Sequence, residues 1–289
     1  MKELLELRVA YEYAHLLFKD DEGENLGESS IYGPTVKVVK IEPHSSLFEE
    51  VGKMDKYLRK KYGTFFFAGW KYIRKYTEKE LAAAKLFQMD VRKYFEPTGE
   101  ECGTEYDENC ACEFCGSGRK QISPLRLKKG NYLNRRDVAI TIGGEIVVSR
   151  RFVETIQENS IKGMMFGDVY IGKSLSGDCF QLMPQGEELN ISKETVFGVN
   201  PYDFSESSPT EVFKCPKGDN LGLNILSEAY VKGSVAISEK DFFISKQTCG
   251  FKSGLLRPSH LLFCSPKLYR VIKENNLKGF NFEVAHVVG

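Results

Sequence analysis

Alternating and helically spaced apolar residues divide the first part of the chain into strands and a helix. Residues 4–14 and 35–41 (TVKVVKI) have the composition and partial alternation of strands. Ser46 and Glu49 then form a capping-box pattern. The apolar residues that follow recur at helical spacing: Leu47, Val51, Met54 and Leu58. This pattern predicts an amphipathic helix over residues 46–61, with a charged outer face.

A second strand and helix follow before the pattern is interrupted. The aromatic run TFFFAGWKYIRKY (64–76) is best read as a strand. Thr77 and Glu80 form another capping box, which opens a short helix through ELAAAKL. Pro97 and Gly99 then break the pattern. We therefore expect a β-rich N-terminal α+β domain over residues 1–97 and a second domain over residues 98–289.

The second half contains an internal repeat. Residues 149–171 (SRRFVETIQENSIKGMMFGDVYI) align without gaps on the segment 265–288 (SPKLYRVIKENNLKGFNFEVAHVV) over about twenty positions. The identical pairs are Ser149/Ser265, Ile156/Ile272, Glu158/Glu274, Asn159/Asn275, Lys162/Lys278, Gly163/Gly279 and Phe166/Phe282. Upstream, DVAIT (137–141) pairs with DFFIS (241–245). The repeat predicts two related units of strand, helix, turn and strand.

Each copy has the signals that begin and end a helix. Ser149 and Ser265 are placed as N-caps, and Pro266 suits the first helical position. The pairs Phe152/Ile156 and Leu268/Ile272 form the predicted buried stripes. Asn159 and Asn275 suit a left-handed C-cap. Gly163 and Gly279 suit the turn into strands that begin at Met164 and Phe280.

Composition and charge limit the classes of function. The chain has 289 residues, 42% of them hydrophobic, which is enough for packed cores. Its 40 basic and 40 acidic side chains cancel, so no global field attracts nucleic acid or an anionic membrane. Charges between Lys2 and Glu12 break every apolar run near the N-terminus, which fits neither a signal peptide nor a membrane span. We expect a soluble cytoplasmic protein with no membrane partner.

Four of the eight cysteines are clustered, and clustered thiols in a reducing compartment favour metal binding over disulfides. The predicted ligands are Cys102, Cys110, Cys112 and Cys115, in the segment ECGTEYDENCACEFCGSGRK. Cys112-x2-Cys115-Gly is half of a zinc knuckle, and four thiolates would close a structural Zn²⁺ site. Because only one residue separates Cys110 from Cys112, either could be replaced by a distant ligand such as Cys215, Cys179 or a histidine. Thiols that merely pack, or redox chemistry, remain alternatives.

A basic stretch after the cysteines suggests a different function. Residues 119–136 contain seven basic side chains and no acidic ones. Beside a zinc ribbon, such a stretch resembles a phosphate-binding surface, although a solvated face is the ordinary explanation. The candidate nucleic-acid-binding residues are Arg119, Lys120, Arg126, Lys128 and Lys129.

No motif of a known catalytic site is visible. The four histidines lie in no recognisable pattern, and no P-loop, GxSxG elbow or HExxH is present. We therefore expect a non-catalytic protein, with no catalytic residue to name. An enzyme whose pocket is assembled from residues distant in sequence is the remaining alternative.

Four segments carry a resemblance to bacterial polymorphic-toxin immunity proteins. They are TEKELAAAKLFQM, the cysteine segment continued through RKQISPLRL, the Asp137 strand with VVSRRFVETIQEN, and the final RPSHLLFCSPKLYRVIKENNLKGFNFE. Together they resemble the immunity protein 11-like and double-CxxCG families, over about residues 75–289. The chain departs from the double-CxxCG pattern because only one C-x2-C-G is complete, and CPKG (215–218) lacks the second cysteine.

The resemblance implies a cytosolic protein that binds and occludes a cognate bacterial toxin domain. Residues 1–74 match no family pattern, and the partner-specific surface is expected there. We therefore predict an α+β protein with mixed sheets, a duplicated strand–helix–strand unit, a zinc-ribbon-like insert and a protein toxin as its partner.

Overall fold

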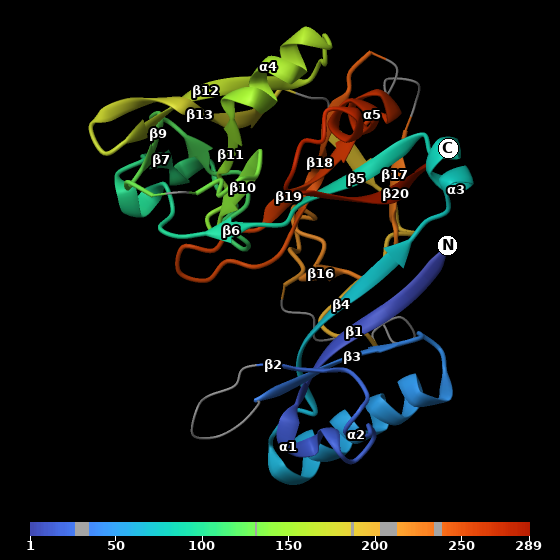
Figure 1. The fold of residues 1–289 in the computed structure, drawn as a ribbon. Helices are drawn as coiled ribbons and strands as arrows, with labels where there is room; N and C mark the ends of the chain where they lie inside the picture. Colours follow the sequence, from blue (N-terminus) through green and yellow to red (C-terminus); the bar gives the residue numbers. More distant parts are fainter. Residues whose placement is uncertain (27–34, 131, 186–187, 203–212, 234–238) are drawn as a thin grey trace. The chain divides into compact units, whose positions relative to one another are not determined.

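The computed structural model describes residues 1–26, 35–130, 132–185, 188–202, 213–233 and 239–289. Its contacts divide the chain into two units. Unit 1 is Met1–Ala82 with the described part of Asn200–Ser207, and unit 2 is the described remainder (Figure 1). Both helices and mixed sheets are present, so the predicted α+β class is confirmed. Among the described residues, no helix combines the length and the apolar character that crossing a membrane requires.

Unit 1 is a four-stranded sheet, in the order β2-β3-β1-β4, combined with a long amphipathic helix. Its elements are β1 (Lys2–Ala10), α1 (Tyr11–Ala14), β2 (Glu24–Leu26), β3 (Val36–Ile41), α2 (Ser46–Tyr62), β4 (Phe67–Lys75) and α3 (Glu78–Ala83). Val51 and Leu58 of α2 are buried in one core with Leu5 and Leu7 of β1. Tyr202 packs on the same core and donates a hydrogen bond to the carbonyl of Phe48.

The local signals in unit 1 predicted β1, β3, α2, β4 and α3 with small shifts, but not α1 or β2. The predicted strand 4–14 ends at Ala10, where the short helix α1 begins. The predicted helix 46–61 is present, but its N-cap is Ser45, whose Oγ accepts from the Phe48 N–H. The Thr77/Glu80 capping box is confirmed, because each side chain accepts a hydrogen bond from the other residue's backbone N–H.

Unit 2 contains a six-stranded sheet, a closed six-stranded barrel and two small hairpin-like sheets. Its first elements are β5 (Leu86–Val91), β6 (Tyr94–Phe95), η1 (Glu100–Cys102), β7 (Tyr106–Asp107), η2 (Glu108–Cys110), β8 (Lys120–Gln121), β9 (Leu125–Leu127), β10 (Val138–Thr141), β11 (Ile146–Ser149), α4 (Arg150–Glu158), β12 (Met164–Ile171) and β13 (Ser174–Pro184). The others are β14 (Glu188–Ile191), β15 (Phe197–Gly198), β16 (Asn224–Ile225), β17 (Ala229–Lys232), β18 (Phe242–Cys249), β19 (Ser259–Cys264), α5 (Pro266–Glu274) and β20 (Phe280–Val288).

The sheet and the barrel have the same strand order. The sheet runs β6-β10-β11-β13-β12-β9, and the barrel runs β14-β18-β19-β5-β20-β17 before β17 pairs with β14 to close it. The first and last pairs are parallel in both, and the pairs between them are antiparallel. The internal repeat therefore extends beyond the aligned segments to the whole architecture of unit 2.

One strand of the barrel comes from a distant part of the chain. In the sheet, β13 directly follows β12, whereas the corresponding barrel strand, β5, precedes the first copy (Figure 1). The correspondence extends to single residues, because Gln181 of β13 lies opposite Val147 and Gln88 of β5 lies opposite Phe263. Since β5 completes the barrel, the division between the units falls at Ala82/Ala83 and not near residue 97.

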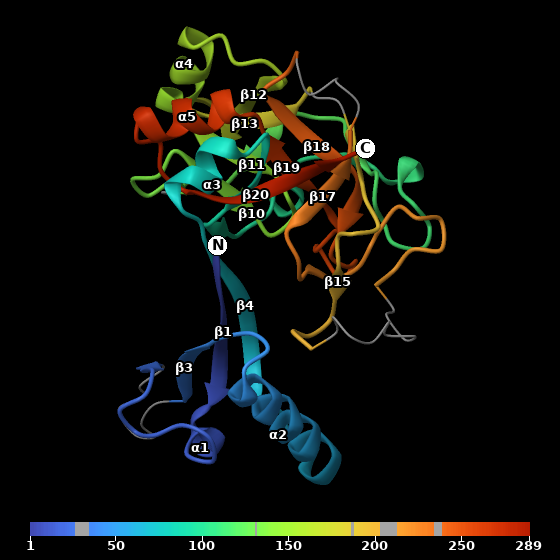
Figure 2. The ribbon, with the colours of Figure 1, turned by 90° about the vertical axis from the view of Figure 1, so that its right-hand side faces the viewer.

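The helices of the two copies begin as predicted, and their C-caps are the predicted Asn159 and Asn275. Ser149 and Ser265 cap α4 and α5, which lie side by side in Figure 2. Phe152 of α4 packs against Phe280 of β20, and Arg151 of α4 donates to the carbonyl of Asn275 after α5. Asn159 and Asn275 have φ near −90° and are not left-handed, so that prediction was wrong. The left-handed residues are Ser160 and Asn276, because each helix makes one more tight turn before the chain reverses.

The predicted turn glycines are confirmed. Gly163 and Gly279 have φ of +101° and +112°, and the strands β12 and β20 begin directly after them. A Cβ on Gly163 would lie 2.5 Å from the carbonyl oxygen of Phe242 in the other copy. These glycines therefore serve both the turn and the close approach of the two copies.

Candidate metal centre

Four side chains from two distant loops meet in unit 2 and are close enough to hold a metal ion. They are Cys112, Cys115, Cys215 and Asp219, and their ligand atoms all lie within 4.8 Å of one another. Cys112 and Cys115 lie between η2 and β8, in the insertion that separates β6 from β9. Cys215 and Asp219 lie between β15 and β16, in the insertion that separates β14 from β17. Each copy of the repeat thus contributes two of the four groups, from corresponding places.

The first loop is a tight turn that directs backbone N–H groups at a sulfur. The Cys112 carbonyl accepts from the Gly116 N–H, and the Cys112 N–H donates to the Ser117 carbonyl at 2.7 Å. Gly116 has φ of +72°, which a side chain would disfavour. The backbone N–H groups of Phe114 and Cys115 donate to the Cys112 sulfur. These two hydrogen bonds lower the pKa of the Cys112 thiol, but burial and the contacts with Asp219 and Cys215 leave it raised overall. The turn itself is typical of a zinc knuckle.

The second loop repeats this arrangement with one ligand exchanged. The Cys215 N–H donates to the Asn220 carbonyl at 2.9 Å, and the Cys215 carbonyl accepts from the Gly218 N–H. Backbone N–H groups of Lys217 and Asp219 donate to the Cys215 sulfur. The Asp219 carboxylate takes the place that a second cysteine would have in a complete knuckle.

The distances agree with a tetrahedral ion. The sulfurs of Cys112 and Cys215 are 3.7 Å apart, which is too far for a disulfide. Two Zn–S bonds of about 2.3 Å at the tetrahedral angle would place the sulfurs about 3.8 Å apart. Asp219 Oδ2 is 3.7 Å from the Cys215 sulfur, close to the separation of about 3.6 Å expected for a sulfur and an oxygen on one zinc ion.

The electrostatics of the centre favour an ionised Cys215. Burial alone would raise the pKa of this thiol. The backbone N–H groups of Lys217 and Asp219, with the thiols of Cys112 and Cys115, outweigh burial and lower its pKa. A thiolate is the form that binds a metal. Three thiolates and a carboxylate in this space would repel one another unless a cation lies between them.

Buried hydroxyl groups connect the two loops behind the ligands. Ser117 Oγ lies 3.1 Å from the Cys115 sulfur and 2.7 Å from Thr248 Oγ1. Thr248 Oγ1 in turn donates to the carbonyl of Asp219 at 2.8 Å. At the surface, Lys217 of the second loop pairs with Glu113 of the first at 2.9 Å. The buried chain orients the ligands, whereas the exposed ion pair adds little.

Two of the four predicted ligands lie outside this group. Cys110 is exposed, and its thiol donates to Asp107 at 3.3 Å, which raises its pKa. Cys110 is the last residue of the short helix η2, where its thiol bonds back to Asp107, so of the two neighbouring cysteines only Cys112 belongs to the cluster. Cys102 ends η1, where burial raises the pKa of its thiol and the Lys128 N–H donates to it. Cys215, which the sequence offered as an alternative ligand, and Asp219 take their places.

The basic residues of the alternative function do not form one free surface. The Arg119 side chain is only 8% exposed and pairs with Glu100 at 2.6 Å and Glu108 at 3.2 Å. Arg126 is half-buried, with its guanidinium over the Tyr170 ring. Lys120, Lys128 and Lys129 are exposed.

Sequence reasoning missed Asp219, although a signal for it existed. The segment CPKGD was read as a knuckle without its second cysteine, and Asp219 directly follows its glycine. Aligning the two insertions of the repeat would have placed this loop opposite the Cys112 loop. A carboxylate is an acceptable zinc ligand where a cysteine is missing.

Models of known protein families give no match to this chain. A search of curated protein sequences gives no match either. The metal centre and the internal repeat are therefore the features from which a function is inferred.

Proposed function

We propose that the centre holds one structural Zn²⁺ ion and that the protein is a non-catalytic cytoplasmic immunity protein that binds and occludes a bacterial toxin domain. The observation that carries the proposal is the meeting of one half-knuckle from each copy of the repeat at a single four-ligand site. A zinc ion there, held by Cys112, Cys115, Cys215 and Asp219, would supply folding free energy and leave no position for a substrate.

The same observation supports the resemblance to double-CxxCG immunity proteins. The incomplete CPKG occupies, in the second copy, the place that the complete C-x2-C-G occupies in the first. The double-CxxCG pattern consists of two such knuckles, and a duplicated protein would carry one in each copy. The departure at the second cysteine is compensated within the site, because Asp219 lies 3.7 Å from the Cys215 sulfur.

Metal analysis tests the zinc ion. We expect about one zinc per purified chain, because three thiolates and a carboxylate complete a tetrahedral site. Cys112→Ser and Cys215→Ser should lose the metal, whereas Cys110→Ser should keep it. The last variant is a matched control, since Cys110 lies two residues from Cys112 but outside the cluster. A folded wild-type protein without bound metal, or loss of zinc in Cys110→Ser, would contradict the assignment.

Co-expression tests the immunity function. Each candidate toxin domain encoded beside this protein is produced with it in a bacterial host, and growth is measured. We expect this protein to rescue growth against one toxin and to copurify with it as a stoichiometric complex. Rescue by the metal-free Cys215→Ser variant should weaken in proportion to its folded fraction. Failure to rescue growth against every neighbouring toxin would refute the immunity proposal while leaving the zinc assignment intact.

A further inference from the structure

A cavity of about 380 Å³ lies in unit 2 where β5 leaves the barrel. Gln88 and Asp90 of β5 lie on the same face of the strand as Leu86, which belongs to the barrel core. Opposite walls come from β16, from the loop Cys249–Leu256 and from the start of β19. This volume is within the range of small-ligand sites, which often occupy barrel mouths.

Two unpaired buried polar atoms belong to residues that line this cavity. Among the described residues, three buried side-chain polar atoms have no hydrogen-bond partner: Gln88 Oε1, Asn220 Oδ1 and Arg257 Nε. Gln88 and Arg257 both line the cavity, and one offers an acceptor while the other offers a donor. An unpaired buried polar atom costs free energy, so its presence points to a missing partner.

The corresponding glutamine of the six-stranded sheet, Gln181, shows which hydrogen-bond partner Gln88 lacks. Gln181 exchanges two hydrogen bonds with Gln121, at 2.9 and 2.6 Å, so both halves of its amide are paired. Gln88 is only 4% exposed, and its amide hydrogen-bonds to the Asp90 carboxylate. Its Oε1 has no counterpart of Gln121. The barrel mouth thus lacks a donor that the sister sheet supplies from its own chain.

The Gln88 end of the cavity is acidic. Asp90, which is exposed, lies at this end of the cavity, two residues after Gln88 on β5. Glu283 faces Gln88 across the β5–β20 pair. The protein atoms around Asp90, followed by the charge of Glu283, raise the pKa of this carboxyl, although the residue is open to solvent at the cavity mouth. A ligand that places a cationic N–H group here would satisfy both the carboxylate and Oε1.

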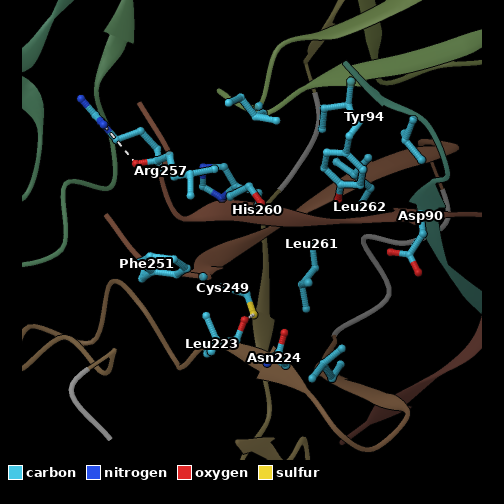
Figure 3. A pocket seen from close by; sticks show the side chains of 18 of the residues that line it. Asp90, Tyr94, Leu223, Asn224, Cys249, Phe251, Arg257, His260, Leu261 and Leu262 are labelled. Atoms are coloured by element: carbon cyan, nitrogen blue, oxygen red, sulfur yellow. Dashed lines mark hydrogen bonds between the residues drawn. The ribbon is translucent and has the colours of Figure 1, made fainter. Parts of the chain in front are cut away.

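The opposite end of the cavity is lined by Arg257. Figure 3 shows Arg257 and Asp90 on opposite sides of the cavity, with His260 and Leu261 between them. Arg257 Nη1 donates to the carbonyls of Gly254 and Leu256, and Nη2 lies 3.6 Å from the Glu108 carboxylate. These contacts fix the side chain while Nε stays unpaired. A ligand acceptor, best an anionic one, suits this end. The middle of the cavity is lined by Leu261, Leu262 and Ile225, and it suits an apolar part of a ligand that joins two polar ends.

We propose that this cavity binds a small zwitterion of the amino-acid or short-peptide class. Its ammonium group lies at Asp90 and Gln88, its carboxylate lies at Arg257, and its apolar part packs against Leu261. The site is independent of the metal centre and of toxin binding. None of the residues that hold the proposed zinc lines it.

Calorimetric titration of the full-length protein tests this site with defined probes. The probes are glycine, β-alanine, γ-aminobutyrate, ε-aminocaproate and leucylglycine, and the monofunctional controls are hexylamine and hexanoate. We expect saturable one-to-one binding that depends on the distance between the two charged groups of the probe. The best zwitterion should bind at least about tenfold more tightly than either control, because each end adds a charge-assisted hydrogen bond.

A pair of variants distinguishes binding at this cavity from a general attraction to charges on the protein surface. Asp90→Asn should weaken the best probe about tenfold, whereas Asp178→Asn, an exposed carboxylate of β13 outside the cavity, should leave its affinity unchanged. Melting curves confirm that both variants are folded. If the wild-type protein bound hexylamine as tightly as the best zwitterion, the zwitterion assignment would be overturned. Absence of binding by every probe to the folded protein would show that the cavity holds only water, and would overturn the proposal.

Discussion

Two aspartates, Asp137 and Asp241, each hold both copies of the repeat at once. Asp241 Oδ1 accepts from Ser265 Oγ at 2.8 Å, and Oδ2 accepts from the backbone N–H of Lys162 at 3.1 Å. Asp137 makes the equivalent bonds to Ser149 Oγ and to the Lys278 N–H, at 2.9 and 2.7 Å. Each carboxylate therefore orients the N-cap serine of its own helix and anchors the turn of the other copy.

This double role gives a prediction at the residue scale. Ser265→Ala removes one helix cap and should lower the free energy of unfolding by about 1 kcal/mol. Asp241→Ala leaves a buried hydroxyl and a partly buried N–H without an acceptor, and should lower the free energy of unfolding by about 2 to 4 kcal/mol. Urea denaturation followed by circular dichroism measures both.

The exposed Asp178 is the control for the loss of a carboxylate. Asp178→Ala should change the free energy of unfolding by no more than about 0.5 kcal/mol. If Asp241→Ala cost no more than Ser265→Ala, the bond to Lys162 would contribute nothing, and the two copies would be joined by apolar packing alone.

At the scale of elements, the helices α2 to α5 and several strands follow from local signals. The reciprocal Thr77/Glu80 bonds, Pro266 at the start of α5 and the buried Phe152/Ile156 stripe are short-range features that spacing alone identifies. The errors are also short-range. Ser45 caps α2 in place of Ser46, because the Ser45 Oγ is the one placed to accept from Phe48.

The candidate metal centre was only half predictable at this scale. A C-x2-C spacing fixes two sulfurs within one turn, so Cys112 and Cys115 could be identified from the sequence. The other two ligands come from a loop about a hundred residues later, and no local spacing relates the two loops. Cys102 and Cys110 are closer in sequence, but local geometry directs Cys110 to Asp107 and places Cys102 against the backbone of Lys128.

At the scale of the whole molecule, the two units have separate cores. The only tryptophan, Trp70, lies on β4 and packs on the core of unit 1. All four proposed zinc ligands belong to unit 2. The stability of the two units can therefore be followed with different probes of one chain.

Chelation of the proposed zinc should destabilise unit 2 selectively. We expect removal of the metal to lower the melting temperature followed by far-ultraviolet circular dichroism by several degrees, as the loss of a few kcal/mol of binding free energy predicts. The transition followed by Trp70 fluorescence should stay in place. Cys215→Ser, already without metal, should not respond to the chelator. A Trp70 transition that moves together with the dichroism would show that the units unfold as one.

The sequence by itself determined the α+β class, the duplicated unit and the first half of the knuckle, because these depend on periodicity, capping and spacing within a few turns. Tertiary structure alone decided that the two copies form a sheet and a barrel of the same strand order. It also decided that β5 completes the barrel, and that Cys215 and Asp219 join Cys112 and Cys115. The physical reason is the same in each case. Strand pairing and metal coordination join residues that are distant along the chain, and local propensity contains no term for such contacts.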